Sequence, residues 1–183
     1  MSGDPVAAFL KPLGGRFWRM HAPMWAFAPM SGDGAARFGG RWNPQGVAAL
    51  YLSETHGTAI AEAQQGVAQP GTIVPYDVAA TRIADLTDPA VQAELALTPA
   101  ILDCPWRSLW LIDRIRPPTW PIVDRLIAAG TEGALVASIV GPDRNLVLWS
   151  WNTVAGADPS PTVTTIDPHG ALPVDQSSWR PQT

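Results

Sequence analysis

The sequence predicts one α+β domain, and three observations point to this fold class. The chain has 183 residues and 46% of them are hydrophobic, which suits a single globular unit with its own core. Strand-like and helix-like segments are mixed without the strict alternation that builds a parallel sheet. No apolar run approaches the roughly 18 residues of a membrane span, and the first residues lack a secretion-signal pattern. We therefore expect a soluble, cytoplasmic protein with no membrane partner.

The expected elements follow from local patterns. Residues 47–53 alternate as a strand with two unlike faces does, and Thr55 or Ser53 can cap the helix that follows. Early prolines and the late Gly130 frame another helix, and the turn at residues 141–143 predicts a hairpin. The full expectation is strands at 17–20, 47–53, 72–78, 135–140, 146–151 and 163–166, and helices at 55–67, 89–97, 106–115 and 117–129.

Composition excludes several kinds of site. The formal net charge is −4 and the isoelectric point is near 5.2, whereas nucleic-acid binding needs a basic face. The single cysteine, Cys104, rules out an internal disulfide framework, and the histidines show no zinc-ligand spacing. His56 and Glu62 do not have the i, i+4 spacing of helical metal ligands. The sequence therefore predicts no metal and no direct nucleic-acid partner.

A glycine-rich segment at residues 31–46, S-G-D-G-A-A-R-F-G-G-R-W-N-P-Q-G, is expected to be loop and turn. It is not a P-loop, because no G-K-[ST] follows, and not a dinucleotide fingerprint, because a turn and a strand follow it. Residues 43–46 have the composition of a type I turn. A simple hairpin there would point Arg41 and Tyr51 to opposite faces, whereas a bend at Gly39-Gly40 would bring both to one cleft.

Arg41, Tyr51 and Glu62 are the best candidates for chemistry, because only 15% of the chain is charged. An arginine between glycines can bind a phosphate bidentately, and a tyrosine ring can stack on a planar heterocycle. A carboxylate can stabilise an oxocarbenium-like centre. Together they fit cleavage of an N-glycosidic bond in a nucleotide such as NAD. The alternative, that Glu62 is an ordinary solvated helix residue, stays open.

Other candidate residues have plainer interpretations. No G-x-S-x-G elbow exists, and Ser138 lies in an apolar segment where a small core residue is expected. Cys104 has no recognisable catalytic context. Most of the nine tryptophans are assigned to the core, with Trp42, beside Arg41, as the expected exception.

These residues also carry a family resemblance. The pieces are W-R at 18–19, the segment at 31–46, A-L-Y-L-S at 49–53, A-I-A-E at 59–62, P-P-T-W at 117–120, G-A-L-V-A-S at 133–138, and Asn145. In this order they resemble the RES-domain family, the toxin halves of RES–Xre toxin–antitoxin pairs, from about Trp18 to Trp149. Ala137 departs from the pattern, because many relatives carry proline before the serine.

The resemblance implies a fold like that of ADP-ribosyltransferases, with a central mixed or antiparallel sheet flanked by helices. The arginine, glutamate and serine of the family name fall on Arg41, Glu62 and Ser138. Tyr51 is the implied aromatic partner, and Arg19 is a second cation. The implied co-substrate is NAD+, without a metal. In that scheme the arginines bind its phosphates and Tyr51 packs against nicotinamide or its ribose. Glu62 stabilises charge at the ribose C1′, and Ser138 binds the ribose or positions Glu62.

The implied function is that of a growth-arresting toxin that cleaves NAD+ and transfers ADP-ribose to a protein acceptor, such as a nucleotide-biosynthesis enzyme. Two alternatives stay open: a glycohydrolase or phosphorylase without a protein acceptor, and a catalytically silent nucleotide- or partner-binding module. The implied partner is an Xre-type helix-turn-helix antitoxin. We expect the catalytic domain at residues 1–155 and a partly packed, proline-rich extension with a mobile end at residues 156–183.

Overall fold

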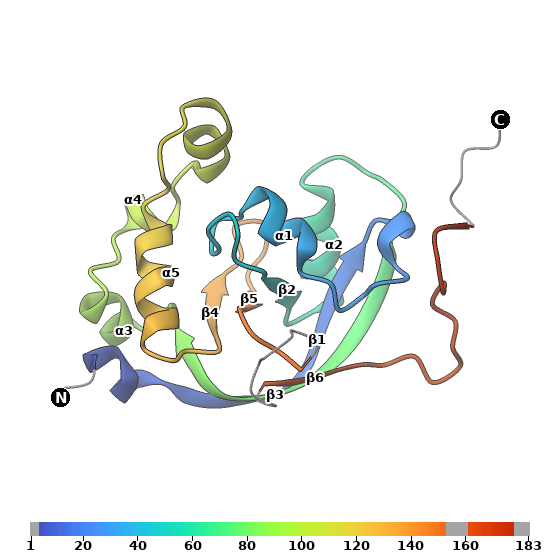
Figure 1. Cartoon of the computed structure of the whole chain (residues 1–183), viewed down its shortest axis with the longest axis horizontal. Helices are drawn as coiled ribbons and strands as arrows, with labels where there is room; N and C mark the ends of the chain where they lie inside the picture. Colours follow the sequence, from blue (N-terminus) through green and yellow to red (C-terminus); the bar gives the residue numbers. More distant parts are fainter. Residues whose placement is uncertain (1–3, 153–160, 178–183) are drawn as a thin grey trace.

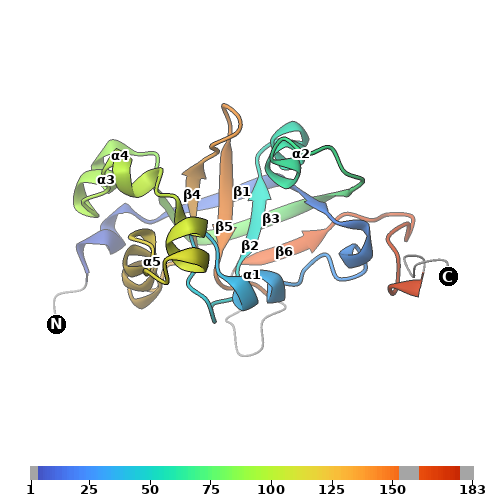
Figure 2. The same ribbon diagram turned by 90° about the horizontal axis from the view of Figure 1, so that it is seen from above.

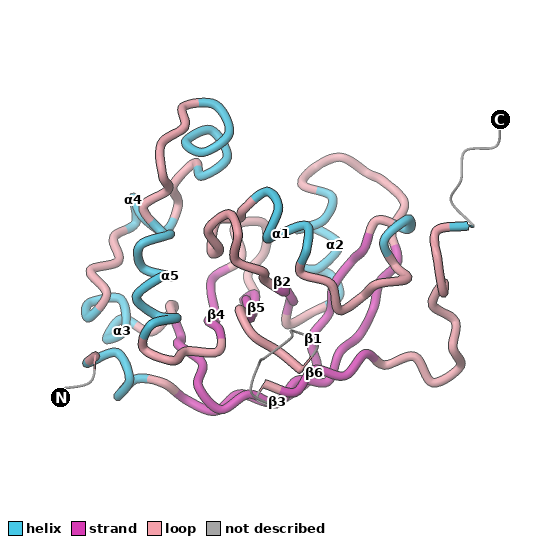
Figure 3. The backbone as a smooth tube through the Cα atoms, viewed as in Figure 1, coloured by secondary structure: helices cyan, strands magenta, loops and turns pink. Residues whose placement is uncertain are grey.

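The computed structural model describes residues 4–152 and 161–177, and it confirms the α+β class (Figures 1 and 3). The strands are β1 (Lys11–His21), β2 (Leu50–Ser53), β3 (Thr72–Asp85), β4 (Gly133–Ala137), β5 (Arg144–Leu148) and β6 (Thr162–Thr165). The α-helices are α1 (Asp33–Phe38), α2 (His56–Gln64), α3 (Pro89–Glu94), α4 (Pro99–Leu102) and α5 (Thr119–Ala128). Short helical turns of other types are η1 (Pro5–Phe9), η2 (Pro23–Trp25) and η3 (Ser108–Ile112).

The strands form one mixed sheet in the order β1-β2-β5-β4-β3-β6, in which only β3 and β4 are parallel. β1 also pairs with β3, so β1 to β5 close into a ring. Ser53 of β2 and Val136 of β4 both pair with Asn145 of β5. The last residues of β2 and β4 therefore lie beside the first residues of β5. α2 lies next to these strands, and α3, α4 and α5 gather at the other end of the molecule (Figures 1 and 2).

Several elements differ from the expectation. β1 and β3 are longer than the strands expected at 17–20 and 72–78, because the two pair with each other over most of their length. Residues 31–46 hold the short helix α1 within the expected loop; it ends at Gly39, whose φ of 74° favours glycine. Of the helix expected at 106–115, residues 106–112 are helical, and their last part is the short π-helical turn η3.

The core lies on both sides of the sheet. On one side α5 and α3 cover a cluster that includes Val123, Val147 and Trp42, and on the other side a second cluster includes Tyr76 and Trp151. Trp42 is only 4% exposed, and its carbonyl accepts a hydrogen bond from the Trp149 indole at 2.7 Å. The expectation that Trp42 lies outside the core is therefore wrong.

Part of the expected C-terminal extension belongs to the sheet, because β6 pairs with β3 over Tyr76–Ala79. The proposed boundary at residue 155 and the end of the chain fall in residues 153–160 and 178–183, outside the described residues. The division into domain and extension therefore stays a prediction. No helix in the described part of the chain is long and apolar enough to cross a membrane.

Candidate active site

Glu62 occupies the last turn of α2 and is half-buried. The helix begins as predicted at Thr55, whose hydroxyl accepts a hydrogen bond from the Thr58 backbone N–H at 3.2 Å. It ends at Gln65, which adopts a left-handed conformation with φ of 45°. The cap and the stop fix the length of α2, and they thereby place Glu62 beside the ends of β2 and β4.

Two uncharged groups donate hydrogen bonds to one oxygen of Glu62. The Ser138 hydroxyl donates to Oε1 at 2.8 Å, and Asn145 Nδ2 donates to the same atom at 2.6 Å. Ser138 directly follows β4 and is half-buried, so it is not the interior strand residue that its apolar neighbours suggest. The structure thus joins Glu62 and Ser138, which are 76 positions apart in the chain.

Asn145 is held in turn by Ser53. The Ser53 hydroxyl donates to Asn145 Oδ1 at 2.7 Å, and both residues are buried. A carboxylate can only accept hydrogen bonds, so the amide nitrogen of Asn145 faces Glu62 and the amide oxygen faces Ser53. The three side chains therefore form a directed chain of donors that ends at Glu62.

The loop between β4 and β5 is fastened to the start of α2. Asp143 Oδ2 accepts hydrogen bonds from the hydroxyls of Thr58 at 2.6 Å and Thr55 at 2.8 Å. These bonds, the Thr58 bond foremost, lower the pKa of Asp143. Gly141 permits the close approach, since a Cβ atom there would lie 3.3 Å from the Thr58 hydroxyl. The loop that carries Ser138 and the helix that carries Glu62 are thus joined at a second point.

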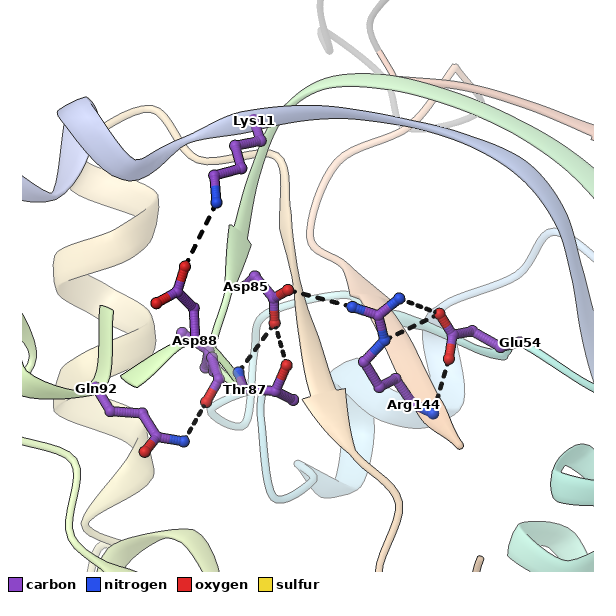
Figure 4. A network of polar contacts seen from close by, with 8 residues as sticks. Lys11, Glu54, Asp85, Thr87, Asp88, Gln92 and Arg144 are labelled. Carbon is purple, nitrogen blue, oxygen red and sulfur yellow. Dashed lines mark hydrogen bonds and ion pairs between the residues drawn. The ribbon is translucent and has the colours of Figure 1, made fainter. Parts of the chain in front are cut away.

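The residue next to Asn145 belongs to a charged cluster (Figure 4). Arg144 donates to Glu54 through Nε at 3.0 Å and Nη2 at 2.6 Å, and to Asp85 through Nη1 at 3.2 Å. Glu54 also accepts from the Arg144 backbone N–H at 3.0 Å. The hydrogen bonds with Glu54 raise the pKa of Arg144. This cluster locks the end of β2 to the start of β5.

Tyr51 supports the turn that carries Arg41. Its hydroxyl donates to Asn43 Oδ1 at 2.7 Å and accepts from the Trp42 backbone N–H at 3.1 Å. Burial raises the pKa of Tyr51, and the hydrogen bond from the Trp42 backbone and the positive charge of Arg41 act in the opposite direction. Gly40 makes room for this contact, because a Cβ atom there would lie 2.5 Å from the hydroxyl.

The hairpin considered from the sequence does not form. Residues 40–43 make only an isolated bridge, between Gly40 and Asn43, and β2 starts at Leu50. The following turn runs from Pro44 to Val47, one residue later than expected, with a 3.1 Å hydrogen bond between its ends. The strand register that would point Arg41 away from Tyr51 therefore does not apply.

Arg41 is half-buried, and its guanidinium Nη1 donates to the Leu102 carbonyl at the end of α4. No ion pair between described residues involves Arg41 or Arg19. An arginine has five donors in a planar fork that matches the oxygens of a phosphate. Among the described residues, the Leu102 carbonyl is the one hydrogen-bond acceptor of the Arg41 guanidinium, so its other donors have no described partner.

The residues around Arg19 are not the ones that contact Glu62. Arg19 donates to the Ser31 carbonyl, just before α1, at 3.2 Å, and burial lowers its pKa. Burial raises the pKa of Tyr76, whereas the positive charge of Arg19 acts to lower the pKa of both His21 and Tyr76, a buried pair that shares a 2.7 Å hydrogen bond. Burial, with the Arg19 charge as a second cause, lowers the pKa of His21 to about 3. Arg19 thus supports the start of the 31–46 segment, and Arg41 lies near its end.

The structure therefore joins some of the expected residues and separates others. Glu62 and Ser138 are in direct contact, and Trp42, the residue after Arg41, donates its backbone N–H to Tyr51, but no hydrogen bond or ion pair between described residues links either arginine to Glu62. Sequence reasoning did not assign Ser53 or Asn145 to the site. Ser53 ends β2 and Asn145 is the second residue of β5, and the available signal was that both belong to pieces of the family resemblance.

The fold and these contacts define an α+β domain with an anchored carboxylate beside the ends of its central strands. The RES domain family model matches residues 16–175. The chain belongs to the RES-domain family, as its sequence motifs predict, and the matched range includes β6.

Solved structures support the same fold. A chain of the crystal structure of the M. tuberculosis MbcT–MbcA toxin–antitoxin complex superposes with a TM-score of 0.60 at 20% sequence identity. The superposition covers 89% of this chain and 90% of that chain. No curated protein matches the sequence.

Proposed function

We propose that this chain cleaves the bond between nicotinamide and ribose in NAD+. The Glu62 carboxylate carries this proposal. Its oxygen Oε1 is held by two neutral donors, and no ion pair between described residues involves Glu62. A fixed carboxylate without a paired cation can stabilise the positive charge that develops at the ribose C1′ as nicotinamide leaves.

Arg41 and Arg19 are proposed to bind the two phosphates of NAD+. Both are arginines without an acidic partner among the described residues, and both contact the 31–46 segment or belong to it. Charge-assisted bonds from such arginines to phosphate are about twice as strong as neutral ones. The Tyr51 hydroxyl is already hydrogen-bonded to Asn43 and to the Trp42 backbone. We therefore assign its role toward nicotinamide or its ribose to the face of the ring.

We further propose that the chain is a toxin held inactive by an Xre-type helix-turn-helix antitoxin in the cytoplasm. Family membership and the fold shared with a chain from a toxin–antitoxin complex support this reading. Growth arrest on expression of the chain alone, relieved by co-expression of a small helix-turn-helix gene from the same locus, is the expected result. Unchanged growth at confirmed expression would contradict it.

The first experiment measures nicotinamide release from NAD+ by the purified chain and by Glu62→Gln. The substitution keeps shape and removes charge, and we expect at least a 100-fold loss of rate. Asp77→Asn is the matched control, because Asp77 is exposed on β3 and its one ion pair within the described residues is with Arg16 at 3.1 Å. Equal rates for wild type and Glu62→Gln would refute the role of Glu62. Intact NAD+ after long incubation with wild type would favour the silent binding module.

The acceptor of ADP-ribose is tested separately. We propose a protein acceptor, and incubation of the chain with NAD+ and cell lysate should then leave an ADP-ribose adduct that mass spectrometry detects. Release of nicotinamide with free ADP-ribose or its phosphorylated form, and without an adduct, would assign the chain as a glycohydrolase or phosphorylase instead.

A further inference from the structure

We propose that Asn145, backed by Ser53, is a positioning residue that fixes the Glu62 carboxylate so that Oε2 faces the reacting ribose. This inference rests on the proposed function for its catalytic meaning, but the contact itself can be tested without it. Asn145 and Ser53 belong to pieces of the family resemblance, but the arginine, glutamate and serine of the family name do not include them.

Asn145 is held firmly in the sheet. It is 9% exposed and lies in β5 between two strands, paired with Ser53 on one side and Val136 on the other. On its N-terminal side, Arg144 is bound by Glu54 and Asp85. A backbone held at three points leaves the Asn145 side chain little freedom, so its amide presents a donor to Glu62 in one geometry.

The Ser53 hydroxyl sets the orientation of that amide. Without it, the amide could rotate and turn its oxygen toward the carboxylate, which would place two acceptors against each other. The 2.7 Å bond from Ser53 to Oδ1 and the 2.6 Å bond from Nδ2 to Glu62 satisfy both ends of the amide at once. Ser53 therefore acts on Glu62 through Asn145.

The two donors meet on a single oxygen, which leaves the carboxylate asymmetric. Ser138 and Asn145 both end on Oε1, and no described hydrogen bond ends on Oε2. The Ser138 oxygen also accepts a hydrogen bond from the Val140 backbone N–H at 3.2 Å, which orients its hydroxyl. Oε1 is thus the anchor, and Oε2 is the oxygen left to face developing positive charge.

The kinetic test uses Asn145→Ala, Ser53→Ala and the control Asn152→Ala. Asn152 is also a structural asparagine, but its Oδ1 accepts from Val163 at 3.0 Å beside β6. Loss of one hydrogen bond to a charged group predicts a fall in kcat of about 10- to 100-fold for Asn145→Ala. The KM for NAD+ should change less than about threefold, because the contact positions a catalytic group and not the substrate. Ser53→Ala should lose less, and Asn152→Ala should match wild type. Unchanged kcat, or a rise in KM alone, in Asn145→Ala would overturn the proposal.

A second test does not depend on activity. Asn145→Asp keeps the acceptor for Ser53 but places a second carboxylate where the 2.6 Å donor was. Two carboxylates so close must share a proton, and they repel each other once both ionise. The melting temperature of Asn145→Asp should therefore fall relative to wild type between pH 5 and pH 8, whereas Asn152→Asp should show no such trend. A flat difference would overturn the contact. If wild type releases no nicotinamide while this pH trend is present, the proposed function fails and the contact between Asn145 and Glu62 stands.

Discussion

Arg144 and Asn145 are adjacent residues of β5, and each belongs to a cluster that binds carboxylates. The two clusters differ in whether a cation or neutral groups bind the carboxylate. At Arg144, the acids Glu54 and Asp85 are both bound by a guanidinium (Figure 4). At Asn145, Glu62 is bound only by an amide and a hydroxyl. The first two carboxylates share a cation, whereas no ion pair between described residues involves Glu62.

This difference in binding partner distinguishes the Arg144 cluster, which is structural, from the Glu62 cluster, which is the candidate active site. Paired charges fix the geometry of a fold and project little field beyond themselves, while neutral donors hold a carboxylate in place without cancelling its charge. The Arg144 cluster also serves its neighbour. The Glu54 backbone N–H donates to the Arg144 carbonyl at 3.1 Å, which keeps Ser53 and Asn145 in register one residue further along.

The largest expected effect on activity comes from placing a cation beside Glu62, so that its cluster resembles the Arg144 cluster. Ser138→Lys would place a cation beside Glu62 in a half-exposed loop that can accommodate the longer side chain. The resulting ion pair should reduce nicotinamide release by about 100-fold or more, with the melting temperature near that of wild type. Ser138→Ala is the matched control, with a loss of about 10-fold from the missing hydrogen bond. If Ser138→Lys were as active as Ser138→Ala, the charge of Glu62 would not matter to the reaction.

The contrast between the clusters also explains what could be predicted from the sequence. The helix that carries Glu62 and its cap are encoded locally; the helix was predicted, and Thr55 is one of the two predicted caps. The contact between Glu62 and Ser138 is not local, because a strand pair and a loop 76 positions away create it. Periodicity alone favoured a core role for Ser138, and only the family resemblance pointed to the site.

Ser53 and Asn145 show why the rest was missed. Each looks like the polar end of a strand, and only the register between β2 and β5 turns these two ends into one hydrogen-bonded pair. Strand register depends on partners far away in the chain, so local residue patterns do not specify it. The same limit hid the length of β1, where Gly14 and Gly15 interrupt the strand signal but pairing with β3 continues.

A second prediction breaks the structural cluster. Arg144→Met would leave Glu54 and Asp85 without their shared cation. The Arg144 side chain is 38% exposed, so solvent screens part of the effect and we expect a loss of about 1–2 kcal/mol of unfolding free energy. That corresponds to a fall of roughly 2–8 °C in melting temperature.

The control for this variant is Arg16→Met, whose ion pair with Asp77 is 54% and 57% exposed and should contribute under about 0.5 kcal/mol. Calorimetry on both variants checks the difference. Equal melting temperatures would mean that the Arg144 cluster holds no more than a surface pair does.

The smallest expected effect concerns the loop that joins both clusters to α2, and it appears as a pH dependence. Hydrogen bonds from Thr58 and Thr55 lower the pKa of Asp143 below its ordinary value of 3.8. As pH falls below that value, the unfolded chain takes up a proton before the folded chain does, so the stabilisation is present above it and is lost on acidification. Asp143→Asn cannot titrate, so its melting temperature should lie below that of wild type by a constant amount from pH 7 to pH 5, and the gap should close below about pH 4. Asp4, whose pKa is lowered to about 2 mainly by its hydrogen bond with Arg125, titrates in both proteins and so cancels in the difference. A gap that stayed constant to low pH would show that Asp143 holds the loop by shape alone and not through its charge.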